Sequence, residues 1–153
     1  MKFIALLLSS AVWMAAVEPA GFRQWSTASL QDTGKRLAAK MDQNKIASEG
    51  LANFGNHSVM VLHREATGQA ELHETQADIF VVQSGEGTLV VGGTVVDSKT
   101  VSPHEVRGPS IKDGVSKRLS PGDIVHIAAK TPHQLMVPAG KEITYLVVKV
   151  DTP

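Results

Sequence analysis

Residues 71–87 read ELHETQADIFVVQSGEG and combine ionisable side chains with the alternation of β-strands. Glu71 and His73 are two residues apart in a predicted strand, so both side chains point to the same face. The next predicted strand begins at Asp78 and carries apolar residues at the following alternate positions. If Asp78 points inward, that face has a polar end and an apolar floor.

A second stretch, PGDIVHIAAKTPH at residues 121–133, ends on a histidine that begins another predicted strand. A closed sheet can bring His133 to the same end as Glu71, His73 and Asp78. Imidazole and carboxylate groups together ligate divalent first-row metals. Each residue alone has another explanation, since polar side chains on strands usually face solvent or bond to backbone. Spacing therefore makes a metal site a hypothesis and does not establish one.

The region around these stretches consists of short runs rich in Val, Ile and Thr, separated by Gly and Pro. Such runs predict an all-β protein, an antiparallel barrel or sandwich. Gly92-Gly93 suits a tight hairpin, and Pro121-Gly122 suits a type II turn. The less regular segment 99–115 is expected to form a long loop or an added hairpin at the barrel rim. The predicted strands are 58–64, 70–73, 78–84, 88–91, 94–98, 116–119, 124–128, 133–137 and 143–150.

The first twenty residues have the pattern of an export signal. Lys2 supplies a positive start, and the apolar run of about 15 residues that follows is shorter than a bilayer span of about 20. A membrane anchor and a packing helix are the alternatives. We expect residues 1–20 to be a signal peptide, removed after Ala16 or Ala20. The mature protein would then be secreted or periplasmic, with no membrane association.

Residues 21–46 predict one short amphipathic helix ahead of the β domain, which we place at 47–153. Ser26 or Thr27 could cap this helix, and Gly34 weakens the prediction. Packing against the main domain is expected rather than a role as a dimer arm, because narrow apolar stripes usually bury locally. The apolar residues at helical spacing are Leu30, Leu37 and Met41.

Composition excludes several classes of function. The 153 residues include 15 Lys and Arg and 15 Asp and Glu, so the formal net charge is zero. A neutral chain with no basic run has no electrostatic footprint for nucleic acid. The absence of cysteine excludes disulfides, thiolate metal sites and cysteine nucleophiles.

The two quoted stretches together resemble the paired motifs of the cupin superfamily, in its small single-domain, type-2-like form. The first cupin motif is built on His-x-His followed by Glu and Gly, and the second on Gly, Pro-x-Gly and His. His73 and His133 match metal-ligand positions of these motifs, whereas Glu71 replaces the first histidine and Asp78 replaces the glutamate. The resemblance covers roughly 58–150 and implies a jelly-roll barrel that holds a metal ion.

The departures from the motifs affect the expected metal centre. Asp78 is one methylene shorter than glutamate, so it could hold a water or a neighbouring side chain instead of the ion. His73, His133 and Glu71 then resemble the two-histidine-one-carboxylate face of non-haem iron centres. Fe(II) or Mn(II) is favoured as the divalent cofactor, with Zn(II) and Ni(II) as alternatives. Two carboxylates on one dication would leave a nearly neutral site with little attraction for an anionic substrate.

The remaining histidines and the reaction are less determined. His63 and His126 could line the cavity, although core packing or a backbone bond is the commoner role. His57 and His104 are expected in solvated turns. No catalytic residue can be named.

The resemblance implies a metal-dependent enzyme acting on a small molecule, such as a dioxygenase, isomerase or lyase. A non-catalytic extracytoplasmic module that binds a small ligand or a metal is the alternative, and in a third reading a metal only rigidifies the barrel. A homodimer is expected by analogy alone.

Overall fold

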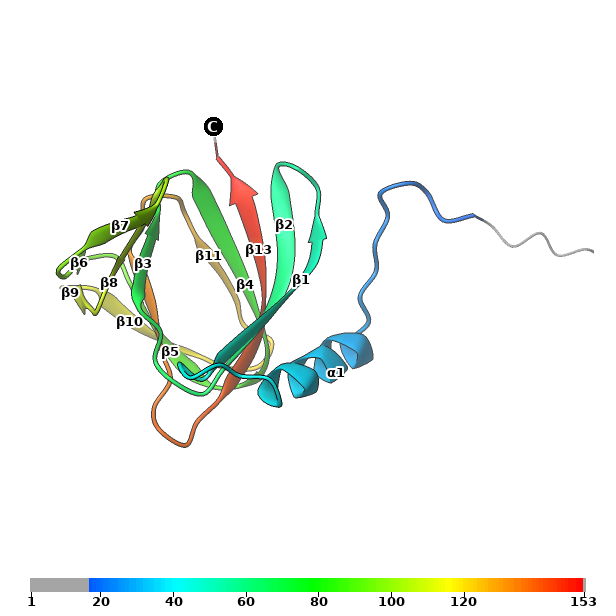
Figure 1. Ribbon diagram of the computed structural model, residues 1–153, viewed down its shortest axis with the longest axis horizontal. Coiled ribbons are helices and arrows are strands. Elements are labelled where there is room, and N and C mark those ends of the chain that lie inside the picture. The colour runs from blue at the N-terminus through cyan, green and yellow to red at the C-terminus, as the bar shows by residue number, and fades with distance from the viewer. Residues whose placement is uncertain (1–16, 153) are drawn as a thin grey trace, which may run out of the picture.

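The structure is a computed structural model that describes residues 17–152. In that range one helix, α1 (Thr27–Ala38), precedes thirteen strands (Figure 1). The strands are β1 (Ile46–Asn53), β2 (His57–Arg64), β3 (Ala70–His73), β4 (Gln76–Gly85), β5 (Gly87–Val91), β6 (Thr94–Val95), β7 (Lys99–Ser102), β8 (Glu105–Gly108), β9 (Ile111–Lys112), β10 (Val115–Leu119), β11 (Ile124–Ile127), β12 (His133–Met136) and β13 (Ile143–Asp151).

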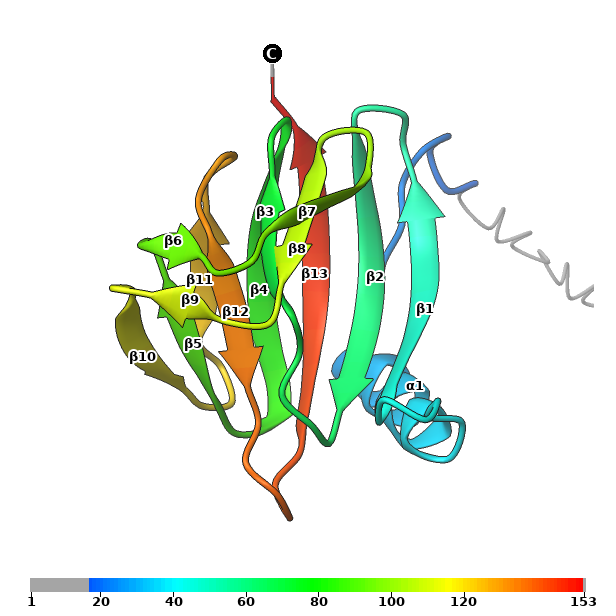
Figure 2. The same cartoon turned by 60° about the vertical axis from the view of Figure 1, so that its left-hand side comes forward.

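Two antiparallel sheets face each other and form a jelly-roll barrel. One sheet has the order β1-β2-β13-β4-β11, and the other has the order β10-β5-β12-β3-β8-β7. A small sheet pairs β6 with β9. Figure 2 shows β3, β8 and β7 in front of β4 and β13, as expected for two facing layers. The predicted all-β antiparallel barrel with a short N-terminal helix is therefore confirmed.

Strand alternation divides the barrel interior into a packed core and an open pocket. Along β4, Asp78 and Phe80 line the pocket, whereas Val82 lies deeper in the apolar core. Leucines from β5, β10 and β12 of the second sheet fill the same core, because inward positions on facing sheets interdigitate. The buried core residues are Phe80, Val82, Leu89, Leu119, Ile127, Leu135, Val137, Ile143, Tyr145 and Val147.

Helix α1 packs on the outer face of the five-stranded sheet. The Ser26 side chain accepts a hydrogen bond from the backbone N–H of Ser29 at 3.2 Å, which caps the first turn. Leu37 is one of the helix residues that this packing buries. Gly34 has a packing role here, since a Cβ at this position would lie 3.0 Å from the Thr144 side chain. The helix approaches β13 closely because it has a glycine at the contact.

The segment 99–115 differs from a simple loop. β7 and β8 form the added hairpin that was the second alternative, and β8 then pairs with β3 inside the six-stranded sheet. β1 was not among the predicted strands, since it contains Gly50 and the polar Ser48 and Glu49. β1 forms because it pairs with β2 along the whole antiparallel edge of that strand, with a bulge after Gly50.

One predicted turn is present and one predicted hairpin is wrong. Gly122 has φ 91°, and the backbone N–H of Asp123 donates to the carbonyl of Ser120 at 3.0 Å, as a type II turn requires. Gly92 and Gly93 both have positive φ. They do not close a hairpin, because β5 and β6 belong to different sheets.

The proposed signal peptide falls mostly outside the described residues. Residues 17–20 are within them and lie in no helix or strand. Among the described helices, none has the length and apolar character needed to cross a membrane.

Candidate metal centre

The four residues singled out from the sequence converge inside the barrel from three strands. β3 contributes Glu71 and His73, β4 contributes Asp78 and β12 contributes His133. β3 and β12 are neighbours, and His133 lies directly opposite Glu71 in their register. Asp78 reaches the same place from the facing sheet. The buried imidazoles of His73 and His133 are 7% and 4% exposed.

The donor atoms lie at distances that suit a shared cation. The Nε2 atoms of His73 and His133 lie 3.4 and 3.5 Å from one oxygen of Asp78. The same nitrogens lie 3.7 and 3.9 Å from one oxygen of Glu71. Four donors about 2.1 Å from one ion in a tetrahedral arrangement are about 3.4 Å apart, so these distances fit a divalent metal.

The hydrogen bonding of His133 is that of a metal ligand. Its Nδ1–H donates to the carbonyl oxygen of Thr131 at 3.1 Å. This bond leaves the lone pair on Nε2, and that atom is buried without a hydrogen-bond partner among the described residues. A backbone bond on one ring nitrogen is the usual way to orient a metal-binding histidine. The residues therefore fit a metal ion at this point.

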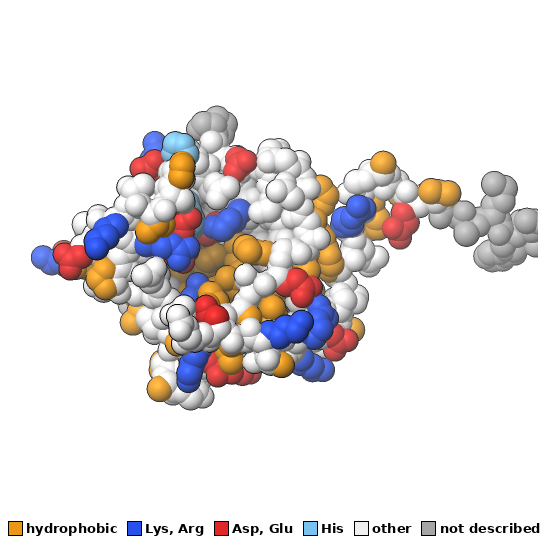
Figure 3. All heavy atoms as spheres, in the orientation of Figure 1, with side chains coloured by type: hydrophobic (Ala, Val, Ile, Leu, Met, Phe, Trp, Pro, Cys, Tyr) orange, Lys and Arg blue, Asp and Glu red, His pale blue; other side chains and the backbone are white. Residues whose placement is uncertain are grey.

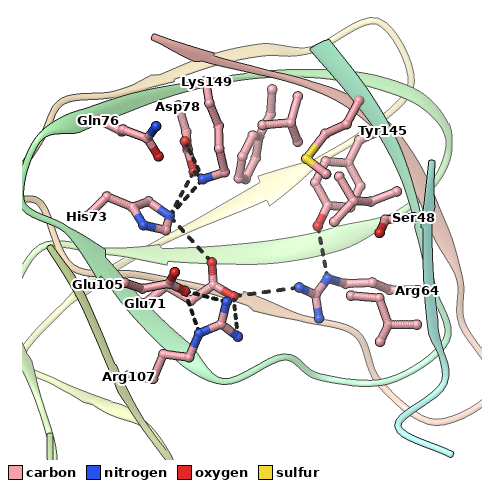
Figure 4. Close-up of a pocket in the computed structure, with 15 residues that line it drawn as sticks. Ser48, Arg64, Glu71, His73, Gln76, Asp78, Glu105, Arg107, Tyr145 and Lys149 are labelled. Carbon is pink, nitrogen blue, oxygen red and sulfur yellow. Dashed lines mark hydrogen bonds and ion pairs between the residues drawn. The ribbon is translucent and has the colours of Figure 1, made fainter. Parts of the chain in front are cut away.

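Lys149 adds a cation that the motifs do not contain. It lies opposite Asp78 in the β13–β4 register. Its ammonium donates to both carboxylate oxygens of Asp78, at 2.9 and 3.2 Å, and lies 2.9 Å from His73 Nε2 (Figure 4). In this arrangement Asp78 is neutralised by a lysine. The donor atoms of Glu71, His73 and His133 all lie within 4.8 Å of one another.

Two arginines surround Glu71 on its other side. Arg107 Nη1 lies 3.3 Å and Arg64 Nη2 lies 3.8 Å from the same oxygen of Glu71. Glu105 accepts a hydrogen bond from Arg107 Nε at 2.6 Å. The hydroxyl of Tyr145 accepts one from Arg64 Nε at 2.9 Å. Figure 4 shows Glu71 between these guanidinium groups and His73, so its carboxylate is held firmly in place.

These contacts change the pKa values of the buried acids. Burial by itself would raise the pKa of Glu71, but the contact with His73 and the charges of the two arginines lower it to about 2. Burial likewise opposes ionisation of Asp78, yet contacts with the two imidazoles and Lys149 hold its pKa below the ordinary value. Both carboxylates are therefore ionised at neutral pH and available to a cation.

His73 receives two opposing influences. Burial and the charge of Lys149 disfavour its protonated form, whereas hydrogen bonds to Asp78 and Glu71 outweigh them and raise its pKa to about 9. The contact with Lys149 works against this value, because an ammonium 2.9 Å from Nε2 requires an unprotonated nitrogen there. In the structure a neutral His73 Nε2 accepts a hydrogen bond from the ammonium of Lys149.

A pocket of about 410 Å³ opens beside this cluster. Figure 3 looks into the hollow, where apolar side chains lie inside and charged side chains gather on one side. Two acids of the cluster face it, Glu71 and Asp78, whereas His133 lies behind them. The apolar wall comes from Ile46, Met60, Leu62, Phe80, Tyr145 and Val147. Such a cavity has the size and polarity of a small-molecule site.

No protein-family model and no curated protein matches the sequence, but solved structures resemble the fold. A Klebsiella pneumoniae protein with a double-stranded β-helix domain is 15% identical over 85% of this chain and 90% of its own, with a TM-score of 0.58. The Cupin_2 domain of an XRE-family transcriptional regulator from Enterobacter cloacae is 15% identical over 71% of this chain and 99% of that domain's chain, with a TM-score of 0.51.

The chain has a cupin fold. The DMSP lyase DddQ from Ruegeria pomeroyi has a related structure, 18% identical over 69% of this chain and 47% of that enzyme, with a TM-score of 0.50. At these identities the likeness establishes the architecture and leaves the reaction open. The cupin barrel explains why four residues far apart in the sequence meet at one point.

The structure places the other sequence candidates away from the cupin pocket. His126 is exposed on the edge strand β11, and His63 is buried under helix α1. His57 and His104 interact with polar neighbours, Asn56 and Glu74, at the surface. None of these four lines the pocket.

Sequence reasoning missed three cations of the pocket. Lys149 alternates with Tyr145 and Val147 in a predicted strand, so its inward direction could have been inferred. Arg64 alternates in the same way with the inward Met60 and Leu62. Arg107 had no such signal, because it lies in the segment expected to be irregular.

Proposed function

We propose that this protein is a metal-dependent cupin that binds, and acts on, a small anionic organic molecule in its barrel. The observation that carries the proposal is the buried Nε2 of His133. It has no hydrogen-bond partner in the described part of the chain and faces Glu71 and His73 within ligand distance of a common point. An isolated buried lone pair beside two carboxylates is costly unless a cation or a proton occupies the space. Once Lys149 moves aside, His73, His133 and Glu71 would hold the ion, with Asp78 as a fourth ligand.

The charges around the pocket support an anionic ligand. Three acids line it and three bases offset them: Glu71, Asp78 and Glu105 against Arg64, Arg107 and Lys149. A divalent ion would therefore give the pocket a net charge of about +2. This corrects the expectation of a nearly neutral site, which counted only the two carboxylates and the metal.

The chain's own residues can orient such a ligand. Arg64 is fixed by Tyr145, and Arg107 is fixed by Glu105, so both guanidinium groups are held ready for a carboxylate or phosphate. Lys149 Nζ, which donates to Asp78, is a proton-bearing group of the pocket. The apolar wall excludes water from the rest of the ligand. When bound, a divalent ion would supply Lewis-acid or water-activating chemistry, and Fe(II) or Mn(II) is favoured over Zn(II) or Ni(II).

Lys149 also favours a second candidate function. Its ammonium already neutralises Asp78 and contacts His73 without a metal. The same barrel could then act as a non-catalytic module that captures an anionic ligand with its three cations. Under either function the predicted signal peptide places the protein in the secreted or periplasmic space. A homodimer stays a prediction, which sedimentation velocity would test.

Metal analysis of purified full-length protein tests the main proposal. We expect one divalent ion per chain at the barrel, lost in His73→Ala and His133→Ala while the far-ultraviolet circular dichroism spectrum is retained. His126→Ala is the matched control, because His126 is exposed on β11 and should keep full metal content. Unchanged metal content in both cluster variants would overturn the proposal. Turnover of small organic acids by the metal-loaded protein would separate an enzyme from a binding module.

A further inference from the structure

A second group of metal-ligating side chains lies outside the barrel, beneath helix α1. It consists of His63, near the end of β2, Glu65, just after that strand, and Glu142, just before β13. Each offers one donor atom, and these atoms all lie within 4.8 Å of one another. None of the three lines the barrel pocket, so the cluster is separate from the proposed metal centre.

His63 has the burial and the hydrogen bonding that are typical of a metal-binding histidine. The residue is 2% exposed, and its Nδ1 is hydrogen-bonded to the Thr144 hydroxyl at 2.8 Å. Its Nε2 is buried without a hydrogen-bond partner among residues 17–152 and lies 3.6 Å from a carboxylate oxygen of Glu65. A hydroxyl that anchors one ring nitrogen leaves the other directed at a fixed point. That point is the space between the two glutamates.

Neither glutamate is ion-paired with a lysine or arginine among residues 17–152, although Lys45 and Lys141 line the pocket that Glu65 and Glu142 share. β2 and β13 pair with Arg64 opposite Ile143, so the same register continued by one residue puts Glu65 opposite Glu142. Like charges directly opposite on neighbouring strands are destabilising. The neighbouring Lys141 pairs with Glu86 at 2.8 Å instead. In the described part of the chain, no lysine or arginine nitrogen lies within 4.0 Å of either carboxylate.

Helix α1 covers this cluster and leaves room at its edge. A cavity of about 290 Å³ lies between the helix and the sheet, lined in part by Gly34, Ala38, His63, Glu142 and Thr144. The last turn of the helix is at this end, where the backbone carbonyls favour a positive charge. The cavity wall holds the imidazole of His63 and the carboxylate of Glu142, together with Lys35, whose ammonium pairs with Asp32 at 3.5 Å. Glu65 completes the cluster from outside this wall.

We propose that His63, Glu65 and Glu142 form a second divalent-cation site, which holds a first-row ion such as zinc and ties the end of β2 to the start of β13 under helix α1. One imidazole and two carboxylate oxygens are an accepted donor set for such ions. The cation relieves the repulsion between the glutamates and satisfies the buried lone pair of His63. Its binding is independent of the barrel centre.

Titration of chelator-stripped full-length protein with zinc, followed by isothermal calorimetry, tests this site. We expect two equivalents for the wild type and one for the double variant Glu65→Gln, Glu142→Gln, with at least a tenfold loss of affinity at the second site. Both glutamates are at least partly exposed, so these variants should fold. Asp113→Asn is the control: Asp113 is exposed in the turn between β9 and β10, and this variant should keep two equivalents.

The outcomes separate this site from the barrel centre. Long-range proton–nitrogen spectra should show the Nε2 signal of His63 shifting with one equivalent, in the wild type and in His73→Ala alike. If the glutamate double variant still binds two equivalents, or if His63 Nε2 does not respond to zinc, the second site is wrong. The wild type could instead bind only one equivalent. If the glutamate double variant loses that equivalent and His73→Ala keeps it, the result supports this site and contradicts the barrel centre.

Discussion

Lys149 and Asp78 face each other across β13 and β4, so the candidate metal centre contains a cation of its own. Asp78 stands where the cupin motif has glutamate, and its shorter side chain reaches the ammonium of Lys149 at 2.9 Å. The shorter acid at position 78 and Lys149 therefore form one ion pair inside the site. A metal that uses Asp78 or His73 must displace this ammonium, which makes Lys149 an internal competitor.

Replacing Lys149 should strengthen metal binding. Lys149→Met keeps the apolar stem but removes the charge, so we expect the dissociation constant for Mn(II) to fall roughly tenfold or more as the repulsion between cations is lost. Competition with a chromophoric chelator measures this change. Lys117→Met, at an exposed position of β10, should have no effect. Weaker binding in the Lys149 variant would mean that the lysine positions Asp78 rather than competing with the ion.

Helix α1 packs on β1 and β2, where Arg36 lies 3.0 Å from Glu49, and makes one close contact with β13. Thr144 is 4% exposed and is hydrogen-bonded to His63, so it has little freedom to move away from the helix. Gly34 lets the helix backbone lie directly on it. The glycine that weakened the helix prediction is therefore what allows the helix to dock.

A larger residue at Gly34 should push helix α1 away from Thr144 of β13. In Gly34→Val the Cβ alone would lie 3.0 Å from Thr144, so the methyl groups overpack the interface, and we expect destabilisation of about 1–3 kcal/mol. Urea denaturation measures the loss. Asp32→Val places the same β-branched residue on the exposed side of α1 and should cost less than about 1 kcal/mol. Equal losses in the two variants would show that helix propensity, not docking, dominates.

At the scale of the whole molecule, the ionised acids of the barrel contribute part of the free energy of unfolding. Glu71 has a pKa of about 2 in the folded chain, below its ordinary value of 4.5. A lowered folded-state pKa contributes stability above about pH 4.5, and this contribution is lost as the pH falls toward 2. Asp78 changes in the same direction, so both acids contribute to this dependence.

Acid titration of the metal-free protein should reveal this dependence. We expect the free energy of unfolding in urea to be nearly constant from pH 6 to 5 and to decrease steadily below about pH 4.5. Glu71→Gln cannot ionise, so its stability should fall less steeply over the same range. An equally steep decrease in the variant would assign acid sensitivity to other carboxylates.

The sequence was sufficient for the barrel and for most of its strands, and with the resemblance to cupins it predicted that Glu71, His73, Asp78 and His133 could meet. Alternation decides which side of a strand faces inward, and it is a local property. The tertiary structure was needed for the cation content of the site. Arg107 enters through β8, which pairs with β3 despite its irregular sequence. Lys149 reaches Asp78 only through the β13–β4 register, because pairing between strands 71 residues apart depends on the whole sheet.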